Sequence, residues 1–225
     1  MGWTPLFLAI KTNLEHAQLL LDNSADINAR ALDGTAPLHW AVGDHCFESV
    51  EFLPRRGADM EARDSNGDTP LHHGSAFKAS QYVESLMSLG ANSEARNING
   101  ETPLHLVCKS KRKYVEDNVF LLVYWGADVE ARDNGGRTPL HVATNLGAVR
   151  VTFDDGGANL EARDDNGKTP LHAACSRGRV GLVRLLSDQK AGLEATTNRR
   201  FQPLHIAALN NFTNCARILL NRGAV

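Results

Sequence analysis

The sequence predicts an all-α solenoid, an elongated stack of similar helix pairs, and three observations support this. A Thr-Pro-Leu-His segment or a close variant occurs seven times in 225 residues. The intervals between these segments are 31 to 36 residues and average 33. A second motif, Gly-Ala-Asp or a relative, closes most units in the same phase. A unit of this size cannot bury its apolar face alone, so units must stack. The segments begin at Thr4, Ala36, Thr69, Thr102, Thr138, Thr169 and Gln202.

Each unit carries signals for two short helices. Thr is a favoured N-cap, and the Pro after it suits the first helical position, where its missing N–H has no cost. Gly near the end of the second helix fits a left-handed C-cap, and Asp/Asn-x-x-Gly stretches predict projecting turns. Small residues that let neighbouring helices approach closely come five after each Thr position: Ala9, Ala41, Gly74, Val107, Ala143, Ala174 and Ala207. The predicted buried stripe of the second helix is Leu20, Leu53, Leu86, Leu122, Phe153, Leu186 and Leu219.

These motifs resemble the ankyrin-repeat family, whose unit is a turn plus two helices with a T-P-L-H-x-A signature. Four units carry Thr-Pro-Leu-His unchanged, and Glu-Ala-Arg also recurs four times. The resemblance covers the whole chain. It implies an ankyrin-repeat solenoid of helix-turn-helix units with projecting β-turn or hairpin loops. We expect one array over residues 1–225, with repeats at approximately 1–30, 31–63, 64–96, 97–132, 133–163, 164–196 and 197–225.

Several units depart from the pattern. Unit five is two residues short, and its second helix, around Val149 to Phe153, is expected to be short or irregular. Unit four carries three extra residues around 109–117. Pro54 is expected to shorten the second helix of unit two. Arg200, where a turn Gly is expected, indicates a different loop in unit seven. Because polar end caps are not evident, we expect a monomer or part of a longer chain.

Composition narrows the classes of function. The chain has 24 basic and 26 acidic residues, a formal net charge of −2, so it lacks the basic surplus of a general nucleic-acid or anionic-membrane binder. No apolar run approaches the roughly 20 residues that span a bilayer. The cysteines are far apart and form no CxxC pair, which indicates a reducing compartment, cytoplasmic or nuclear. They are Cys46, Cys108, Cys175 and Cys215.

Nine histidines raise the question of a metal site, but six of them occupy the signature position. Helices in contact lie about 8–10 Å apart, so the signature histidines of successive units cannot share one ion at about 2 Å. The family resemblance implies that this His is structural and bonds the neighbouring loop and the Thr. We find no converging acid, base or nucleophile. We therefore expect no enzyme activity, no metal, no cofactor and no small-molecule substrate.

Two charged features leave alternatives open. An Arg column recurs at repeat spacing, and it is either a solvated charge ladder between loops, which the weakness of surface ion pairs favours, or a row that grips an acidic partner. A basic run in unit four is a solvated loop, a docking patch for an acidic peptide or, least favoured, a nucleic-acid contact. The Arg column is Arg30, Arg63, Arg96, Arg132 and Arg163. The basic run is Lys109, Lys111, Arg112 and Lys113, with Tyr114.

The resemblance implies that the partner is another protein. Ankyrin arrays bind through their loops and the exposed face of the first helices, so we expect a scaffold or adaptor. The alternative is a targeting or regulatory fragment of a larger multidomain enzyme or signalling protein. Aromatic and Arg side chains are the preferred anchors of interfaces. The expected contact residues are Phe77, Ile98, Arg137, Arg177, Phe201, Trp3, Asp68, Glu101 and Lys168.

Overall fold

The computed structural model describes residues 2–76, 80–112 and 116–225. Within these residues the chain forms fourteen α-helices, one π-helical turn and no strand. The first helices of the seven units are α1 (Pro5–Thr12), α3 (Pro37–Gly43), α5 (Pro70–Ala76), α7 (Pro103–Lys109), α9 (Pro139–Val142), α11 (Pro170–Ser176) and α13 (Pro203–Leu209). The second helices are α2 (Leu14–Asp22), α4 (Phe47–Arg55), α6 (Ser80–Ser88), α8 (Glu116–Tyr124), α10 (Leu146–Arg150), α12 (Val180–Asp188) and α14 (Thr213–Asn221).

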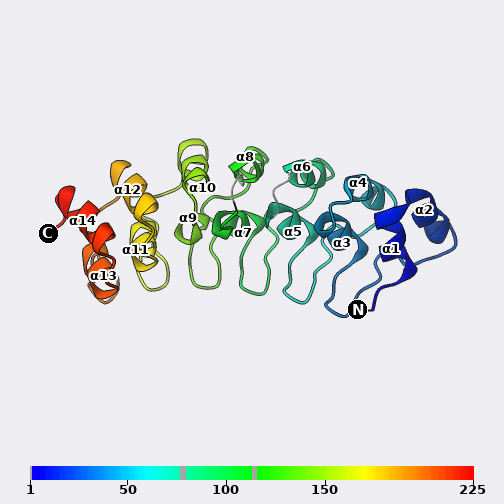
Figure 1. Ribbon diagram of the computed structural model, residues 1–225, viewed down its shortest axis with the longest axis horizontal. Coiled ribbons are helices and arrows are strands. Elements are labelled where there is room, and N and C mark those ends of the chain that lie inside the picture. The colour runs from blue at the N-terminus through cyan, green and yellow to red at the C-terminus, as the bar shows by residue number, and fades with distance from the viewer. Residues whose placement is uncertain (1, 77–79, 113–115) are drawn as a thin grey trace.

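The helix pairs stack side by side in chain order (Figure 1). The first helices form one row, the second helices form a row above them, and the loops project from the opposite side. Each first helix contacts the first helix of the next unit, from α1 with α3 to α11 with α13. Tertiary contacts therefore join neighbours in sequence, and the molecule is elongated. The predicted all-α solenoid is confirmed.

Every first helix begins at the Pro of its signature segment. The residue before this Pro is extended, as in Thr102 with φ −88° and ψ 166°, because an α conformation there would clash with the ring. The Thr cap differs from the expectation. The Thr102 hydroxyl lies 2.9 Å from Nδ1 of His105 and makes no bond to a helix N–H.

The core is a ribbon of Leu and small residues between the two helix rows. Leu53, Leu86 and Leu122 of the second helices are completely buried, and so are Ala41 and Val107 of the small-residue column. Burial of one Leu side chain contributes about 1.5–3 kcal/mol, and neighbouring units share each layer. Leu20 is only half-buried, because α2 has a neighbouring unit on one side in this chain.

Unit five is irregular, as its short length predicted. Its second helix ends at Arg150 and continues as a π-helical turn, Val151–Asp155. The completely buried side chain here is Thr152, whereas the expected core residue Phe153 is half-exposed. The Thr152 carbonyl accepts from the N–H of Ala158, the role that Leu86 has in unit three. The prediction for Phe153 is wrong because the wider turn moves the core register by one residue.

Two other local expectations are wrong. Helix α4 extends to Arg55 and is nine residues long, like α6 and α8. Pro54 lies in its last turn, where the missing N–H removes a single intrahelical bond. The loop of unit seven keeps the common form, since Arg200 adopts the left-handed φ of 62° that glycine has elsewhere. No following loop packs against Arg200 in this chain, so its Cβ has room.

Gly67 has no such room. Its φ is +73°, and an added Cβ would lie 2.9 Å from the backbone nitrogen of Ile98 in the next loop. Gly57 has φ +90° with no atom within 4 Å of an added Cβ. Both Ala substitutions incur the left-handed backbone cost of roughly 1–2 kcal/mol. We expect Gly67→Ala to lower the free energy of unfolding by at least about 1 kcal/mol more than Gly57→Ala, through the clash. Urea unfolding followed by circular dichroism measures both, and equal losses would contradict the loop packing.

Candidate protein-binding surface

Each projecting loop is a tight hairpin closed by backbone hydrogen bonds. In unit three, the N–H of Asp64 donates to the Asp68 carbonyl at 3.0 Å. The Asp64 carboxylate accepts from the N–H groups of Asn66 and Asp68 at 2.8 and 2.9 Å. Successive loops are also joined, since the N–H of Ile98 donates to the Asn66 carbonyl at 3.0 Å. The loop tips are therefore fixed relative to one another.

A signature histidine ties five of the first helices, α3, α5, α7, α9 and α11, to the next loop. The Thr102 N–H donates to Nδ1 of His105 at 3.2 Å, so Nε2 carries the proton and donates to the Arg137 carbonyl at 2.9 Å. This is the structural role that the resemblance implies. Burial lowers the pKa of His39 to about 4. Burial also lowers the pKa values of His72, His105, His141 and His172. The same Nε2 bond joins His39 to Asp68, His72 to Glu101, His141 to Lys168 and His172 to Phe201.

The Arg column has a structural role in joining the loops. Nη1 of Arg30 donates to the Gly34 carbonyl at 2.9 Å in its own loop and to the Arg63 carbonyl at 2.7 Å in the next. These exposed guanidinium groups thus join consecutive loops through backbone carbonyls. This agrees with the favoured interpretation of a solvated ladder between the loops, although the bonds are to carbonyls and not to carboxylates. The pattern is repeated by Arg63, Arg96, Arg132 and Arg163.

The expected contact residues that precede a signature segment differ in how available their side chains are. Asp68 is half-buried and accepts from the Asn97 amide at 2.9 Å. Glu101 is 1% exposed, and its carboxylate accepts from the Lys109 ammonium at 2.8 Å. The Glu101 carboxylate is therefore not available to a partner, and the exposed group at this position is the Lys109 ammonium that it binds. Lys168 is half-buried.

Arg137 forms an ion pair with Asp133, a residue that the sequence analysis did not identify. Its guanidinium pairs with the buried carboxylate at 2.6 Å. The hydrogen bond that Arg137 donates to this carboxylate raises the pKa of Arg137. Arg177 is exposed, and its Nη1 donates to the His141 carbonyl at 2.7 Å. Both Arg side chains line one hollow at units five and six.

The expected apolar anchors lie at separate places along the array. Ile98 is 64% exposed at a loop tip. Phe201 is 39% exposed and lines a groove of about 460 Å³ together with Lys168 and Leu209. Trp3, at the other end, packs on Trp40 with ring centroids 4.4 Å apart. Phe77 lies outside the described residues.

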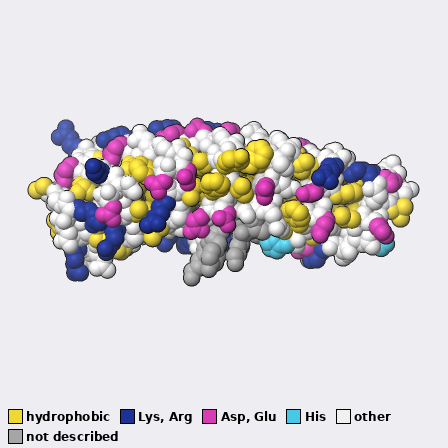
Figure 2. All heavy atoms as spheres, turned by 90° about the horizontal axis from the view of Figure 1, so that it is seen from above, with side chains coloured by type: hydrophobic (Ala, Val, Ile, Leu, Met, Phe, Trp, Pro, Cys, Tyr) yellow, Lys and Arg dark blue, Asp and Glu magenta, His cyan; other side chains and the backbone are white. Residues whose placement is uncertain are grey.

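The second helices carry an apolar patch that the sequence reasoning missed. Figure 2 looks onto these helices and shows hydrophobic side chains gathered near the middle of the array. In α8 the exposed fractions are 48% for Phe120 and 73% for Tyr124, and the adjoining Trp125 is 43% exposed. Three aromatic residues within one short segment could have indicated this patch, but the family resemblance implies binding through the loops and the first helices.

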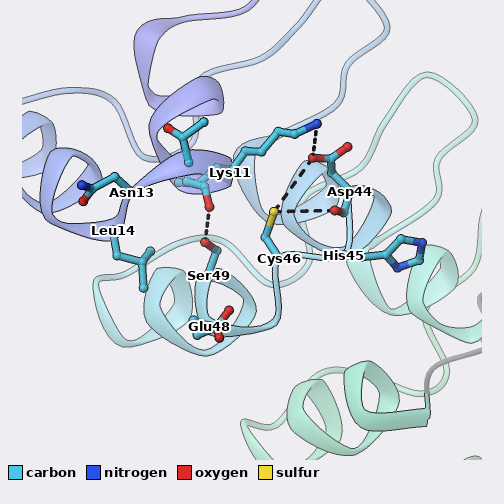
Figure 3. A pocket seen from close by; sticks show the side chains of 10 residues that line it. Lys11, Asn13, Leu14, Asp44, His45, Cys46, Glu48 and Ser49 are labelled. Carbon is cyan, nitrogen blue, oxygen red and sulfur yellow. Dashed lines mark hydrogen bonds and ion pairs between the residues drawn. The ribbon is translucent and has the colours of Figure 1, made fainter.

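A hollow between units one and two contains a cysteine but no activated nucleophile. It holds about 350 Å³ and is lined by Cys46, Asp44 and Lys11 among others (Figure 3). Burial, followed by the nearby carboxylate of Asp44, raises the pKa of the Cys46 thiol. The Lys11 ammonium is held by Asp44 at 2.7 Å, and the His45 ring points away from the sulfur in Figure 3. These groups do not converge as a base and nucleophile would.

Asp64, Asp68 and His73 could each offer a ligand atom, and these atoms lie within 4.8 Å of one another. They already have protein partners. Nε2 of His73 lies 3.0 Å from the Asp64 carboxylate, and Asp68 accepts from Asn97. Burial opposes ionisation of Asp64, but hydrogen bonds from His73 and the loop N–H groups outweigh it and lower its pKa. A loop-stabilising network accounts for the trio.

Comparison with known proteins agrees with this architecture. A family model for ankyrin repeats in three copies matches residues 1–64, 83–153 and 144–225. The chain belongs to the ankyrin-repeat family. Among solved structures, this ankyrin-repeat chain is similar to the ankyrin repeat domain of Bcl-3, described as a unique member of the IκB protein family. The two share 29% sequence identity and a TM-score of 0.80, over 97% of this chain and 99% of the other. No curated protein sequence matches the chain significantly.

No helix in the described part of this ankyrin-repeat chain has the length and hydropathy to cross a bilayer.

The histidine bond predicts a stability difference between two units. His105→Ala removes the bond to the Arg137 carbonyl and leaves the Thr102 N–H without its acceptor, so we expect a loss of roughly 2–3 kcal/mol. His205 of the last unit is exposed, and His205→Ala should change stability by less than about 0.5 kcal/mol. Urea unfolding of both variants measures this. Equal losses would show that the histidine acts only through local helix capping.

The lowered histidine pKa values predict acid sensitivity. The ordinary His pKa is 6.5, and that of folded His39 is about 4. Between these values the unfolded chain binds a proton that the folded chain does not. The free energy of unfolding therefore decreases as the pH is lowered from 6.5 to about 4, and it has its full value above pH 6.5. The lowered pKa of His39 alone corresponds to a decrease on the order of 3 kcal/mol in the free energy of unfolding across this pH range. Urea midpoints at about pH 7 and about pH 5 measure the loss. A stability that stays constant over this range would contradict neutral, buried rings.

Proposed function

We propose that this chain is a protein-binding scaffold or adaptor, and that residues 1–225 act as a single array with the expected repeat boundaries. The partner contacts the loop tips and the exposed face of the first helices. One observation carries the proposal, namely that exposed apolar side chains stand on loop tips whose backbones are hydrogen-bonded to neighbouring loops. Leu32 is 84% exposed and Ile98 is 64% exposed. Such rigid, exposed apolar groups contribute binding free energy with little loss of conformational entropy.

Family membership supports this proposal, because the ankyrin-repeat fold is a non-catalytic, protein-interaction fold. The similarity to the Bcl-3 domain over nearly the full length of both chains supports treating the whole chain as one ankyrin repeat domain.

The proposal contains no enzymatic step, cofactor or metal, and no nucleic-acid, membrane or small-molecule partner. Burial raises the pKa of the Cys108 and Cys175 thiols to about 12, so neither is a ready nucleophile. We place the protein in the cytoplasm or nucleus, as a monomer or as part of a longer chain. All four cysteines are free, which supports a reducing compartment.

Affinity capture from a cell extract with quantitative mass spectrometry tests the proposal. The variant Ile98→Ala with Phe201→Ala removes two apolar anchors from the loop side. The control, Leu19→Ala with Leu220→Ala, removes side chains that are 61% and 55% exposed on second helices. We expect captured partners to lose at least about tenfold in affinity with the loop variant and little with the control. Equal losses from both variants, or no captured protein at any concentration, would overturn the proposal.

A further inference from the structure

Unit five contains a hollow where its first helix is cut short. Helix α9 has four residues, Pro139–Val142, whereas α7 and α11 on either side have seven each. After α9 the chain is held against the end of α7, since the N–H of Thr144 donates to the Cys108 carbonyl at 3.0 Å and its hydroxyl donates to the Ser110 carbonyl at 2.7 Å. The missing helical turn leaves a hollow of about 290 Å³ between the ends of α7 and α11.

The walls of this hollow are cationic. Its lining residues are Lys109, Lys111, Arg137, Val142, Thr144, Arg177 and Arg179. Two of the five cations are already paired, Lys109 with Glu101 and Arg137 with Asp133. In the described part of the chain, no carboxylate lies within ion-pairing distance of the other three cations. Those three are Lys111, Arg177 and Arg179.

Two details show that positive charge at this place is incompletely compensated. Partial burial of the guanidinium first, and then repulsion from Arg137 and Arg179, lowers the pKa of Arg177. Nε of Arg179 is buried and has no hydrogen-bond partner among the described residues. Like charges gathered in a partly enclosed hollow strengthen its field, which attracts an anion. An anion in this hollow would supply the missing countercharge.

We propose that the hollow at unit five binds carboxylate side chains from an acidic segment of the partner protein. This proposal rests on the proposed protein-binding function and assigns a chemical class to the partner. Guanidinium groups suit carboxylates because their paired N–H donors match two carboxylate oxygens. The whole chain has a net charge of −2. Nucleic acid is therefore the poorer match, because it requires cations along an extended backbone.

Binding of short labelled peptides to the whole chain, followed by fluorescence anisotropy, tests this inference. The probe is a peptide of alternating Glu and Ser, and its control has Gln in place of every Glu. The variant Arg177→Gln with Arg179→Gln removes two cations of the hollow. The matched variant, Arg55→Gln with Arg184→Gln, makes the same change of net charge on the exposed faces of α4 and α12.

Arg177 also holds the His141 carbonyl, so a second variant avoids any effect on folding. Lys111 is exposed, and Lys111→Glu reverses one charge at the rim. We expect the Glu peptide to bind, and each hollow variant to weaken it by about tenfold. Added salt should weaken this binding. The matched variant should bind as the unchanged chain does, and the Gln peptide should not bind.

Equal binding of the Glu peptide by the hollow and matched variants would overturn the inference. So would tighter binding of a single-stranded oligonucleotide of the same charge, or of a phosphoserine peptide, since either would assign another ligand. The partner capture described above separates this inference from the proposed function. Failure of the Glu peptide to bind the unchanged chain, with capture through Ile98 and Phe201 intact, would remove only the acidic site, whereas absence of any captured protein would remove the function itself.

Discussion

The hydrogen bond from the signature histidine to the carbonyl of the next loop is the interaction on which the rest of the structure depends. It is buried, it joins one unit to the next, and it requires a neutral ring whose proton is on Nε2. Because the ring accepts from its own helix start through Nδ1, one side chain satisfies a backbone donor at the helix and a backbone acceptor in the loop. Loop geometry is thereby coupled to helix stacking along the array.

This coupling explains how the surface can vary while the fold stays constant. The backbones of the inner loops are held by the histidine, by the Arg column and by bonds between loops, so the side chains at their tips are not needed for the fold. Ile98 can therefore be apolar and exposed there. The same constancy makes unit five informative. When α9 loses its last turn, the neighbouring units keep their positions, and the space left between them becomes a hollow with a basic lining.

The fold could be predicted from the sequence because every unit carries the signature segment or a close variant of it. The spacing of these segments and the helix-start signals within them support the same fold. It failed where an outcome depends on long-range geometry. The shift from Phe153 to Thr152 follows from a π-helical turn, which no local propensity specifies. The bond from Arg30 to the Arg63 carbonyl requires knowledge of which loop lies beside which. The cations of the hollow come from three units, so only the structure shows that these basic residues, which are separate in the sequence, lie together.

The central claim is that buried, neutral histidines hold the loops, and long-range ¹H–¹⁵N correlation spectra of the imidazole nitrogens test it most directly. At about pH 6, near the ordinary histidine pKa, the account predicts the neutral form protonated on Nε2 for His39, His72, His105, His141 and His172. Charged rings, or rings protonated on Nδ1, would show that the histidines cannot donate to the neighbouring loops while accepting from their own helices, and the account would be contradicted.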